Sequence, residues 1–271
     1  MAKVRKGGKY GYINAKGVAV IPIVYDSLED FHDGLAYAEK DGKCGWLNMK
    51  GEVVIPFICN FGGSSYDGLL YANKDGKYGW FNMKGEVVIP FIYDEGAVRE
   101  DIPFWCCDGL ISVSKDGKYG FINKNGEEIV PFVYDYTGTF ENGFAVVKKE
   151  GKYGYVNTKG EEIIPCIYDG IGGFSEGYVC VEKDGKCGFV NKNGEEVVPF
   201  IYDDARAFQD GIAGVCKEGK WGYVNTKGEE IIPCIYDGVY DYPGDFCYGV
   251  ALVRKNDKWG FVDKNGKDTF Q

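Results

Sequence analysis

Hydrophobic and polar residues follow one another in short runs that recur along the chain with a fixed period. In one period, residues 34–40 alternate small and large side chains, residues 43–47 form a second extended run, and residues 52–58 form a third. The third run is apolar at nearly every position. Alternation over a few residues predicts half-buried strands, and a short continuous apolar run predicts a strand covered on both faces. The chain is therefore predicted to be all-β.

Two kinds of turn separate the three runs. Asp41-Gly42 lies between the first and second runs. An Asp-Gly pair there predicts a two-residue type I′ hairpin, because both turn residues need a positive φ. Asn48 to Gly51 lies between the second and third runs, where Asn can accept from its own backbone two residues on and Gly can take the left-handed conformation. Each period is thus predicted to be a three-stranded antiparallel meander.

The tetrad Gly-Lys-(Tyr/Trp/Cys)-Gly marks eight copies of this meander. Its last glycine is found at Gly11, Gly45, Gly79, Gly120, Gly154, Gly188, Gly222 and Gly260. The spacing is 34 residues in five intervals, and it rises to 41 and 38 residues in the two others, where extra residues enter. A fixed period of this kind is typical of repeat architectures. We expect a single repeat domain over residues 1–271, with repeats at about 1–33, 34–67, 68–108, 109–142, 143–176, 177–210, 211–248 and 249–271.

Seven of the nine prolines occupy one position in the third run: Pro22, Pro56, Pro90, Pro131, Pro165, Pro199 and Pro233. Proline cannot donate to a β-ladder, so the third strand should be an edge strand or should bulge there. Both faces of these small sheets are apolar and need covering, and in a tandem array the neighbouring repeat supplies the cover.

Two architectures meet this requirement, a closed propeller-like toroid and an open β superhelix, and we slightly favour the toroid. The third run of repeat 8, residues 267–270, is polar and short. It suits a capping repeat, or a strand that pairs with the N-terminus.

Repeat 7 carries the full motif: Lys-Trp-Gly at 220–222, an Asn-x-x-Gly turn at 225–228, Ile-Pro at 232–233 and Tyr-Asp at 236–237. In these features the sequence resembles the WG-repeat (KWG-repeat) family of bacterial proteins, across essentially the whole chain. Only repeats 7 and 8 have Trp in the Trp-Gly position, where the others have Tyr or Cys. The resemblance implies an all-β repeat fold and brings no catalytic residues with it.

Composition and charge limit the classes of partner that the chain is expected to bind. The chain is 45% apolar and 27% charged, which is globular composition, and its net charge of −10 disfavours nucleic acid. No apolar stretch approaches the ~20 residues of a membrane helix, so no membrane insertion is expected. The N-terminal residues enter the repeat pattern directly. We therefore expect a cytoplasmic protein, the alternative being that a leader was removed.

The ten cysteines fall into two groups. Seven occupy repeat positions that are apolar elsewhere, and we expect them to be buried free thiols, which fit a reducing compartment. They are Cys44, Cys59, Cys166, Cys180, Cys187, Cys216 and Cys234. Cys106, Cys107 and Cys247 lie in the two long insertions. The adjacent pair Cys106-Cys107 is either redox-active or simply packed, and we favour packing. No CxxC pair exists, so a zinc site is not expected.

No set of titratable residues forms a catalytic motif. His32 is the one histidine and is expected to be a solvated loop residue. The Glu-Glu pairs at 127–128, 161–162, 195–196 and 229–230 recur at one turn position and are interpreted as solvated charges rather than a glycosidase pair. An Asp follows the Tyr of the third run in six repeats. It is interpreted as an Asx turn, with a cation-binding ring as the alternative. We expect no enzyme activity, no cofactor and no metal.

The two insertions are the candidate binding site. Insertions in repeat arrays map to loops on one face, often the binding face, and these two are rich in aromatic residues. The candidate residues are Arg99, Phe104 and Trp105 in the first insertion and Tyr240, Asp241, Tyr242 and Phe246 in the second. A bland alternative is that these loops only cover an array end.

Two functions are compatible with this pattern. The first is a protein-interaction scaffold that engages a partner through its variable linkers and insertions. The second is a carbohydrate or cell-envelope binding module, which predicts one exposed aromatic residue per repeat at regular spacing. The buried character of the tyrosine positions favours the scaffold.

Overall fold

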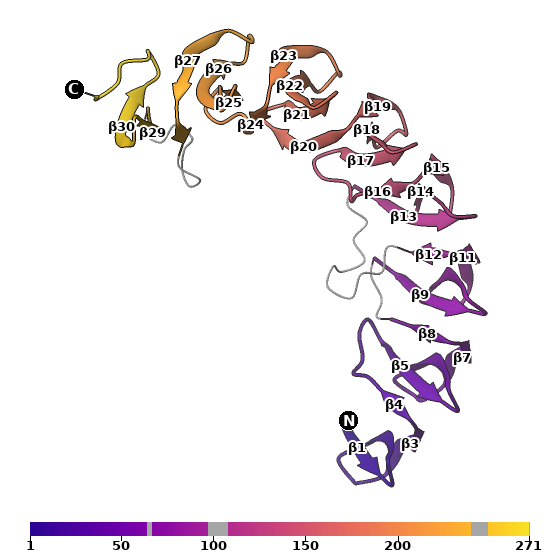
Figure 1. Cartoon of the computed structure of the whole chain (residues 1–271). Helices are drawn as coiled ribbons and strands as arrows, with labels where there is room; N and C mark the ends of the chain where they lie inside the picture. The colour runs from indigo at the N-terminus through magenta and orange to yellow at the C-terminus, as the bar shows by residue number, and fades with distance from the viewer. Residues whose placement is uncertain (64–66, 97–107, 240–248, 271) are drawn as a thin grey trace. The chain divides into compact units, whose positions relative to one another are not determined.

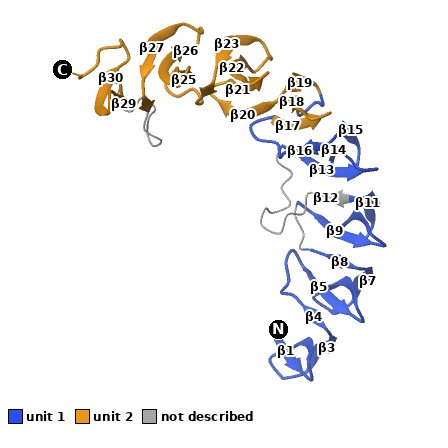
Figure 2. Cartoon of the chain, in the orientation of Figure 1, with its two compact units in different colours: residues 1–143, 158–160 blue, residues 144–157, 161–271 orange. Residues whose placement is uncertain are grey.

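The computed structural model describes residues 1–63, 67–96, 108–239 and 249–270, and every regular element within them is a β-strand (Figure 1). The all-β prediction is confirmed. The chain divides into two compact units, shown in Figure 2. Unit 1 comprises residues 1–143 and 158–160, and unit 2 comprises residues 144–157 and 161–271.

Unit 1 contains repeats 1 to 4 as small antiparallel sheets, in the orders β1-β2-β3, β4-β5-β6-β7, β8-β9-β10-β11 and β12-β13-β14-β15. The strands are β1 (Ala2–Lys6), β2 (Lys9–Ile13), β3 (Ala19–Tyr25), β4 (Ser27–Leu28), β5 (Leu35–Lys40), β6 (Lys43–Asn48), β7 (Val53–Cys59), β8 (Phe61–Gly62), β9 (Leu69–Lys74), β10 (Lys77–Asn82), β11 (Val87–Tyr93), β12 (Glu95–Gly96), β13 (Leu110–Lys115), β14 (Lys118–Asn123), β15 (Glu128–Tyr134) and β16 (Tyr136–Thr137).

Unit 2 contains repeats 5 to 8, in which neighbouring strands pair antiparallel in the orders β17-β18-β19, β20-β21-β22-β23, β24-β25-β26-β27 and β28-β29-β30. The strands are β17 (Phe144–Lys149), β18 (Lys152–Asn157), β19 (Glu162–Tyr168), β20 (Gly170–Ser175), β21 (Tyr178–Lys183), β22 (Lys186–Asn191), β23 (Glu196–Tyr202), β24 (Asp204–Ala205), β25 (Ile212–Lys217), β26 (Lys220–Asn225), β27 (Glu230–Tyr236), β28 (Gly238–Val239), β29 (Val250–Lys255) and β30 (Lys258–Asp263).

The predicted meander is present, and the structure adds a short strand to it. In repeat 2, the linker residues of β4 pair with β5, with Ser27 opposite Glu39 and Leu28 opposite Ala38. The linker turns back along the first strand of the next meander, and the N–H of Asp26 donates to the Glu39 carbonyl at 2.8 Å. A two-residue strand has no hydrophobic period, so the sequence pattern did not predict it.

Both predicted turns are confirmed. Asp41 and Gly42 have φ values of 53° and 74°, as a type I′ hairpin needs. In the second turn, the Oδ1 of Asn48 accepts from the N–H of Lys50 at 2.9 Å and from that of Glu52 at 3.0 Å. The turn closes with Gly51 at φ 80°.

The third strand is both an edge strand and a bulged strand, which accounts for its proline. In repeat 5, Tyr153 and Tyr155 of β18 lie opposite Tyr168 and Ile164 of β19, so β19 carries extra residues around Pro165. The bulge brings the β19 backbone against Gly154. A Cβ at Gly154 would lie 2.5 Å from the Ile164 carbonyl oxygen, which explains why the tetrad ends in glycine.

The core is a series of small clusters between successive repeats. Between repeats 5 and 6, Ile164 and Tyr168 pack against Val179, Val181 and Val190, and all five are nearly inaccessible to solvent. Equivalent clusters join repeats 1 and 2 and repeats 7 and 8. At these junctions within each unit, a sheet is covered by its neighbour, as predicted from the apolar residues on both faces. The choice between toroid and superhelix depends on how units 1 and 2 are placed relative to each other, and it stays a prediction.

Candidate binding surface

The aspartate after the third strand links one repeat to the next. In repeat 5, one carboxylate oxygen of Asp169 binds the tetrad lysine Lys152, and the other accepts from the N–H of Asp184, at 2.9 Å, in the next hairpin. The same ion pair recurs as Lys9–Asp26, Lys77–Asp94, Lys118–Asp135, Lys186–Asp203 and Lys220–Asp237. The hydrogen bond from the lysine, more than any other contact, lowers the pKa of Asp169.

This geometry corrects the Asx-turn interpretation of these aspartates. The backbone N–H that Asp169 accepts belongs to a residue 15 positions further along, not to the adjacent turn. A lysine ammonium already neutralises each of these six carboxylates. We therefore interpret the aspartates as structural contacts rather than as ligands of a cation.

The first glutamate of each Glu-Glu pair also has a local role. The Nδ2 of Asn157 donates to Oε2 of Glu161 at 2.6 Å across the second turn. The same bond is present at Asn48–Glu52, Asn82–Glu86, Asn123–Glu127, Asn191–Glu195 and Asn225–Glu229. These carboxylates are turn residues on the surface, as the sequence indicated.

The aromatic residue directly after the tetrad glycine, here called the slot aromatic, is buried in seven repeats. These residues are Tyr12, Trp46, Trp80, Phe121, Tyr155, Phe189 and Tyr223, each at most 6% exposed. In four repeats a phenylalanine of the following linker packs against the slot aromatic in a tilted or edge-on arrangement. The centroid distances are 5.3 Å for Tyr12–Phe31, 4.7 Å for Phe121–Phe140, 4.8 Å for Tyr155–Phe174 and 4.7 Å for Phe189–Phe208. In these four repeats the linker thus helps to bury the slot aromatic.

Repeat 8 departs from this rule. Its slot aromatic Phe261 is 49% exposed, and so is its tetrad aromatic Trp259, while Val250 is 38% exposed. Arg254 lies opposite Trp259 in the β29–β30 register, with its guanidinium 6.0 Å from the ring centroid. Alternate residues of paired strands share a face, so these four side chains form one surface, which we call the repeat 8 face.

Sequence reasoning missed the repeat 8 face, because Trp259 was assigned to a regular structural position. Exposure of Phe261 depends on what packs against it, and no residue pattern within repeat 8 indicates that.

The site residues predicted in the insertions lie outside the described residues. These are Arg99, Phe104, Trp105, Tyr240, Asp241, Tyr242 and Phe246, and Cys106, Cys107 and Cys247 lie there too. Their assignment stays a prediction. In the sequence, the second insertion ends at Tyr248, and Val250 of the repeat 8 face comes two residues later.

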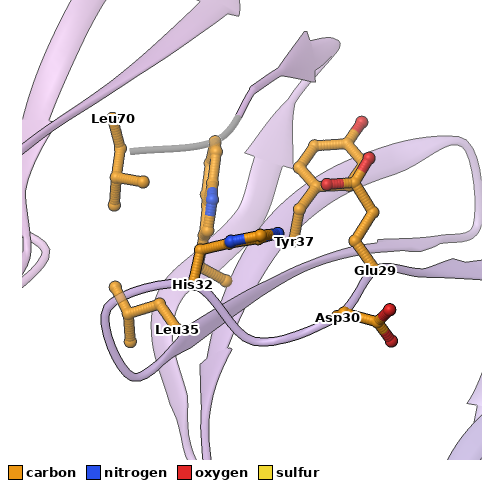
Figure 3. Close-up of a pocket in the computed structure, with 7 residues that line it drawn as sticks. Glu29, Asp30, His32, Leu35, Tyr37 and Leu70 are labelled. Atoms are coloured by element: carbon orange, nitrogen blue, oxygen red, sulfur yellow. The ribbon is translucent and has the colours of Figure 1, made fainter. Parts of the chain in front are cut away.

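A small pocket in unit 1 surrounds the single histidine (Figure 3). Its lining includes His32, the carboxylates Glu29 and Asp30, and the rings of Tyr37 and Trp46. His32 is exposed, as predicted, and its imidazole points toward Tyr37 in Figure 3. The pocket has room for about one water molecule.

Burial makes several of the cysteines that the structure describes poor nucleophiles. Cys44, Cys59 and Cys216 are buried, as predicted, whereas Cys166, Cys180, Cys187 and Cys234 are half-buried. Burial raises the pKa of Cys180 to about 12, and that of Cys166 and Cys234 to about 11. Because the thiolate is the reactive form, these thiols are held in an inert state.

The family model described as the WG containing repeat matches the chain seven times. The matched segments are residues 10–44, 45–78, 78–119, 119–153, 153–187, 188–221 and 221–259. This chain belongs to the WG-repeat family. The seven matches run from one tetrad aromatic to the next, so they agree with the eight tetrads. A repeat β fold of the WG-repeat family is consistent with a non-catalytic binding module.

The comparison with solved structures finds chains of low sequence identity and low TM-score. A eukaryotic initiation factor is 11% identical with a TM-score of 0.39, and the match covers 99% of this chain and 83% of that one. Hsv2p of Kluyveromyces lactis is 10% identical with a TM-score of 0.32, covering 88% of this chain and 90% of that one. The comparison with curated proteins finds no matching sequence.

Within the described ranges, no group of three or more His, Cys, Asp or Glu side chains could hold a metal ion. The same ranges contain no helix long and apolar enough to cross a membrane.

Proposed function

We propose that this WG-repeat chain is a non-catalytic, cytoplasmic scaffold that binds a partner protein. In this proposal the two aromatic insertions and the repeat 8 face carry the contact. The observation that supports it most is the exposure of Phe261 and Trp259, each 49%, at positions where the other repeats bury or half-bury the side chain. Aromatic and arginine side chains dominate the energetics of protein interfaces, and the repeat 8 face also carries Arg254.

The regular surface of the repeats favours a protein partner over a carbohydrate. A sugar-binding array would present one exposed aromatic per repeat, but the slot aromatics of seven repeats are buried. The regularly exposed residue is instead aliphatic and lies on the edge strand after the proline. The residues at this position are Val24, Ile58, Ile92, Val133, Ile167, Ile201 and Ile235, between 38% and 44% exposed.

The described side chains also support a role without catalysis. A hydrolytic triad needs a nucleophile, a base and a group that orients the base, all within hydrogen-bonding reach. His32 has two carboxylates in its pocket lining but no serine or cysteine among them. The carboxylates of Asp169 and its equivalents are bound to lysines. The polar groups of the repeats thus serve the fold.

Affinity capture followed by direct binding measurements tests the proposal. The full chain is immobilised, proteins are captured from a lysate of the source organism, and the captured partner is then purified for calorimetry. Trp105→Ala, Tyr242→Ala and Phe261→Ala should each weaken binding about tenfold or more, as expected for interface anchors. The control is Tyr136→Ala, which removes a ring that is 42% exposed but lies outside both insertions and the repeat 8 face.

Two outcomes would count against the scaffold. If all three variants bind the purified partner as tightly as the control does, the insertions and the repeat 8 face are not the interface. If captured material is released only by free sugars, the carbohydrate-binding alternative replaces the proposal.

A further inference from the structure

Repeat 2 carries two cysteines where most repeats carry two aromatic rings. In five repeats, the aromatic residue of the tetrad lies opposite the last residue of the third strand. These pairs are Tyr10–Tyr25, Tyr78–Tyr93, Tyr119–Tyr134, Tyr153–Tyr168 and Trp221–Tyr236. In repeat 6 one ring is lost, and Cys187 faces Tyr202. In repeat 2 both are replaced, and Cys44 on β6 lies directly opposite Cys59 on β7. The two positions have changed together.

The backbone register places these cysteines at bonding distance. Directly opposed residues of antiparallel strands have Cα atoms about 4.5–5.5 Å apart, and disulfides span about 4.4–6.8 Å between Cα atoms. The two thiols lie close enough to shift each other's pKa, and both side chains are completely buried. No rearrangement of the backbone is needed to join the two sulfur atoms.

We propose that Cys44 and Cys59 form a cross-strand disulfide when the protein meets a disulfide oxidant such as glutathione disulfide. One thiolate attacks the oxidant, giving a mixed disulfide and one glutathione thiolate. The second cysteine, losing its proton, displaces the second glutathione. The protein loses two hydrogens, and one glutathione disulfide becomes two glutathione molecules.

The two thiols affect each other's ionisation. Their contact lowers the pKa of Cys59 and raises the pKa of Cys44. The lysines Lys74 and Lys43 also lower the pKa of Cys59. Either thiolate can begin the exchange, and the other cysteine then resolves the mixed disulfide.

The cross-link would secure an edge strand. β7 is the outermost strand of its sheet, and its only ladder within that sheet is with β6, which includes the Cys44–Cys59 pair. A disulfide there closes a loop of about 15 residues and restricts the unfolded chain, which stabilises the folded repeat. This inference is independent of the proposed function, because neither cysteine belongs to the insertions or to the repeat 8 face.

The chain contains its own control pair. Cys180 and Cys187 also contact each other, but Cys180 lies opposite Phe189 and Cys187 lies opposite Glu182. They are diagonal neighbours, whose Cα atoms are about 7–8 Å apart, beyond the usual reach of a disulfide. Burial raises the pKa of both thiols. Contact alone should therefore not link them.

Thiol mapping across a redox series tests the inference. The full chain is equilibrated in glutathione buffers from fully reduced to fully oxidised, with enough urea to allow transient opening, and free thiols are then alkylated in denaturant. We expect peptide mapping to show a Cys44–Cys59 cross-link two hydrogens lighter than the thiols, with Cys180 and Cys187 alkylated. The oxidised protein should melt several degrees higher than the reduced protein.

The double variant Cys44→Ala/Cys59→Ala should abolish that difference in melting temperature. Full alkylation of Cys44 and Cys59 in the most oxidising buffer would overturn the inference. So would linkage of either residue mainly to another cysteine. If the double variant does not fold, the mapping on the natural chain decides by itself. The midpoint of the series also gives the potential of the pair, and so the redox environment in which it stays closed.

Discussion

The backbone of the opposite strand comes so close that only glycine fits at the last position of the tetrad. Gly154 has a φ that any residue can adopt, so glycine is needed there for space and not for backbone conformation. The bulge at Pro165 brings the Ile164 carbonyl and the Cys166 backbone nitrogen within 2.5 and 2.9 Å of the position of a Cβ. The proline and the glycine are therefore two parts of one local structure, and one explains the other.

Gly154→Ala should destabilise the chain by about 1–3 kcal/mol, the usual cost of forcing extra atoms into a packed site. Two of the three closest atoms belong to the backbone, which cannot move aside as a flexible side chain would, and the third is the Cys166 Sγ. Urea unfolding followed by circular dichroism measures the effect. Gly173→Ala is the matched control, because nothing lies within 4 Å of a Cβ there, and we expect a change of no more than about 0.5 kcal/mol. Equal effects of the two substitutions would refute the steric account.

At the scale of elements, the linker helps to bury the slot aromatic in four repeats. Phe208 packs on the slot aromatic Phe189 of repeat 6 and on Tyr178, with centroids 4.7 and 4.9 Å away. It leaves Phe189 fully buried, whereas Phe261 at the same position of repeat 8 is 49% exposed. The same repeat position is therefore a core residue in repeat 6, where a linker ring covers it, and a surface residue in repeat 8.

The same substitution should have different effects at these two positions. Phe189→Ala removes a fully buried ring and should cost about 3–5 kcal/mol, whereas Phe261→Ala should cost about 1 kcal/mol or less. The free energies of unfolding of the two variants, measured in the same buffer, give the comparison. A large loss on Phe261→Ala would show that this ring is part of the core, and the repeat 8 face would then lose its support.

The elements of the meander were predictable, but the links between them were not. Asp41-Gly42 and the turn from Asn48 carry their conformations locally, so the sequence predicted both turns and the strands beside them. The bond from Asp169 to the N–H of Asp184 depends on the linker doubling back along the next hairpin. No local pattern encodes that path. The repeat 8 face was missed for the same reason, because exposure of Phe261 depends on a neighbour and not on its own repeat.

The Lys–Asp links predict a response to acid. The lysine lowers the pKa of Asp169, so this group stabilises the fold fully above its unfolded pKa of about 3.9. The contribution is lost as the pH falls through the lower, folded pKa. Asp169→Asn should therefore lose less stability than the natural chain between pH 5 and pH 2.5, as measured by the urea midpoint.

Repeat 2 shows that this substitution fits, because Lys43 donates to Asn60 at 2.5 Å in the same position. The groups are exposed, so 1 M salt should reduce the difference between the two proteins. If the urea midpoints of the natural chain and of Asp169→Asn fall equally with decreasing pH, the stabilising role of the Asp169 carboxylate is contradicted.

At the scale of the whole molecule, stability is distributed over a series of junctions between neighbouring repeats. The clusters that join repeats 5 and 6, and repeats 7 and 8, each draw residues from two consecutive repeats. Arrays of this kind behave as a sum of repeat stabilities and nearest-neighbour terms. A repeat with one neighbour in the chain then has less stability to draw on than a repeat with two.

Amide exchange should therefore be uneven along unit 2. Repeat 8 packs on repeat 7 through Ala251, Val253 and Val262, but its other face is exposed and its third strand is reduced to a single bridge between Val262 and Asp268. We expect the ladder amides of β29 and β30 to exchange at least about tenfold faster than those of β21 and β22, which have a repeat on both sides. Deuterium uptake by mass spectrometry compares them directly, because Val253–Gly260 and Val181–Gly188 are equivalent pairs.

Equal protection would mean that the repeats open together, and the nearest-neighbour picture would fail. The same measurement also bears on function. In the proposed complex the partner covers Phe261 and Trp259, so the purified partner should slow exchange in β29 and β30 and leave β21 and β22 unchanged.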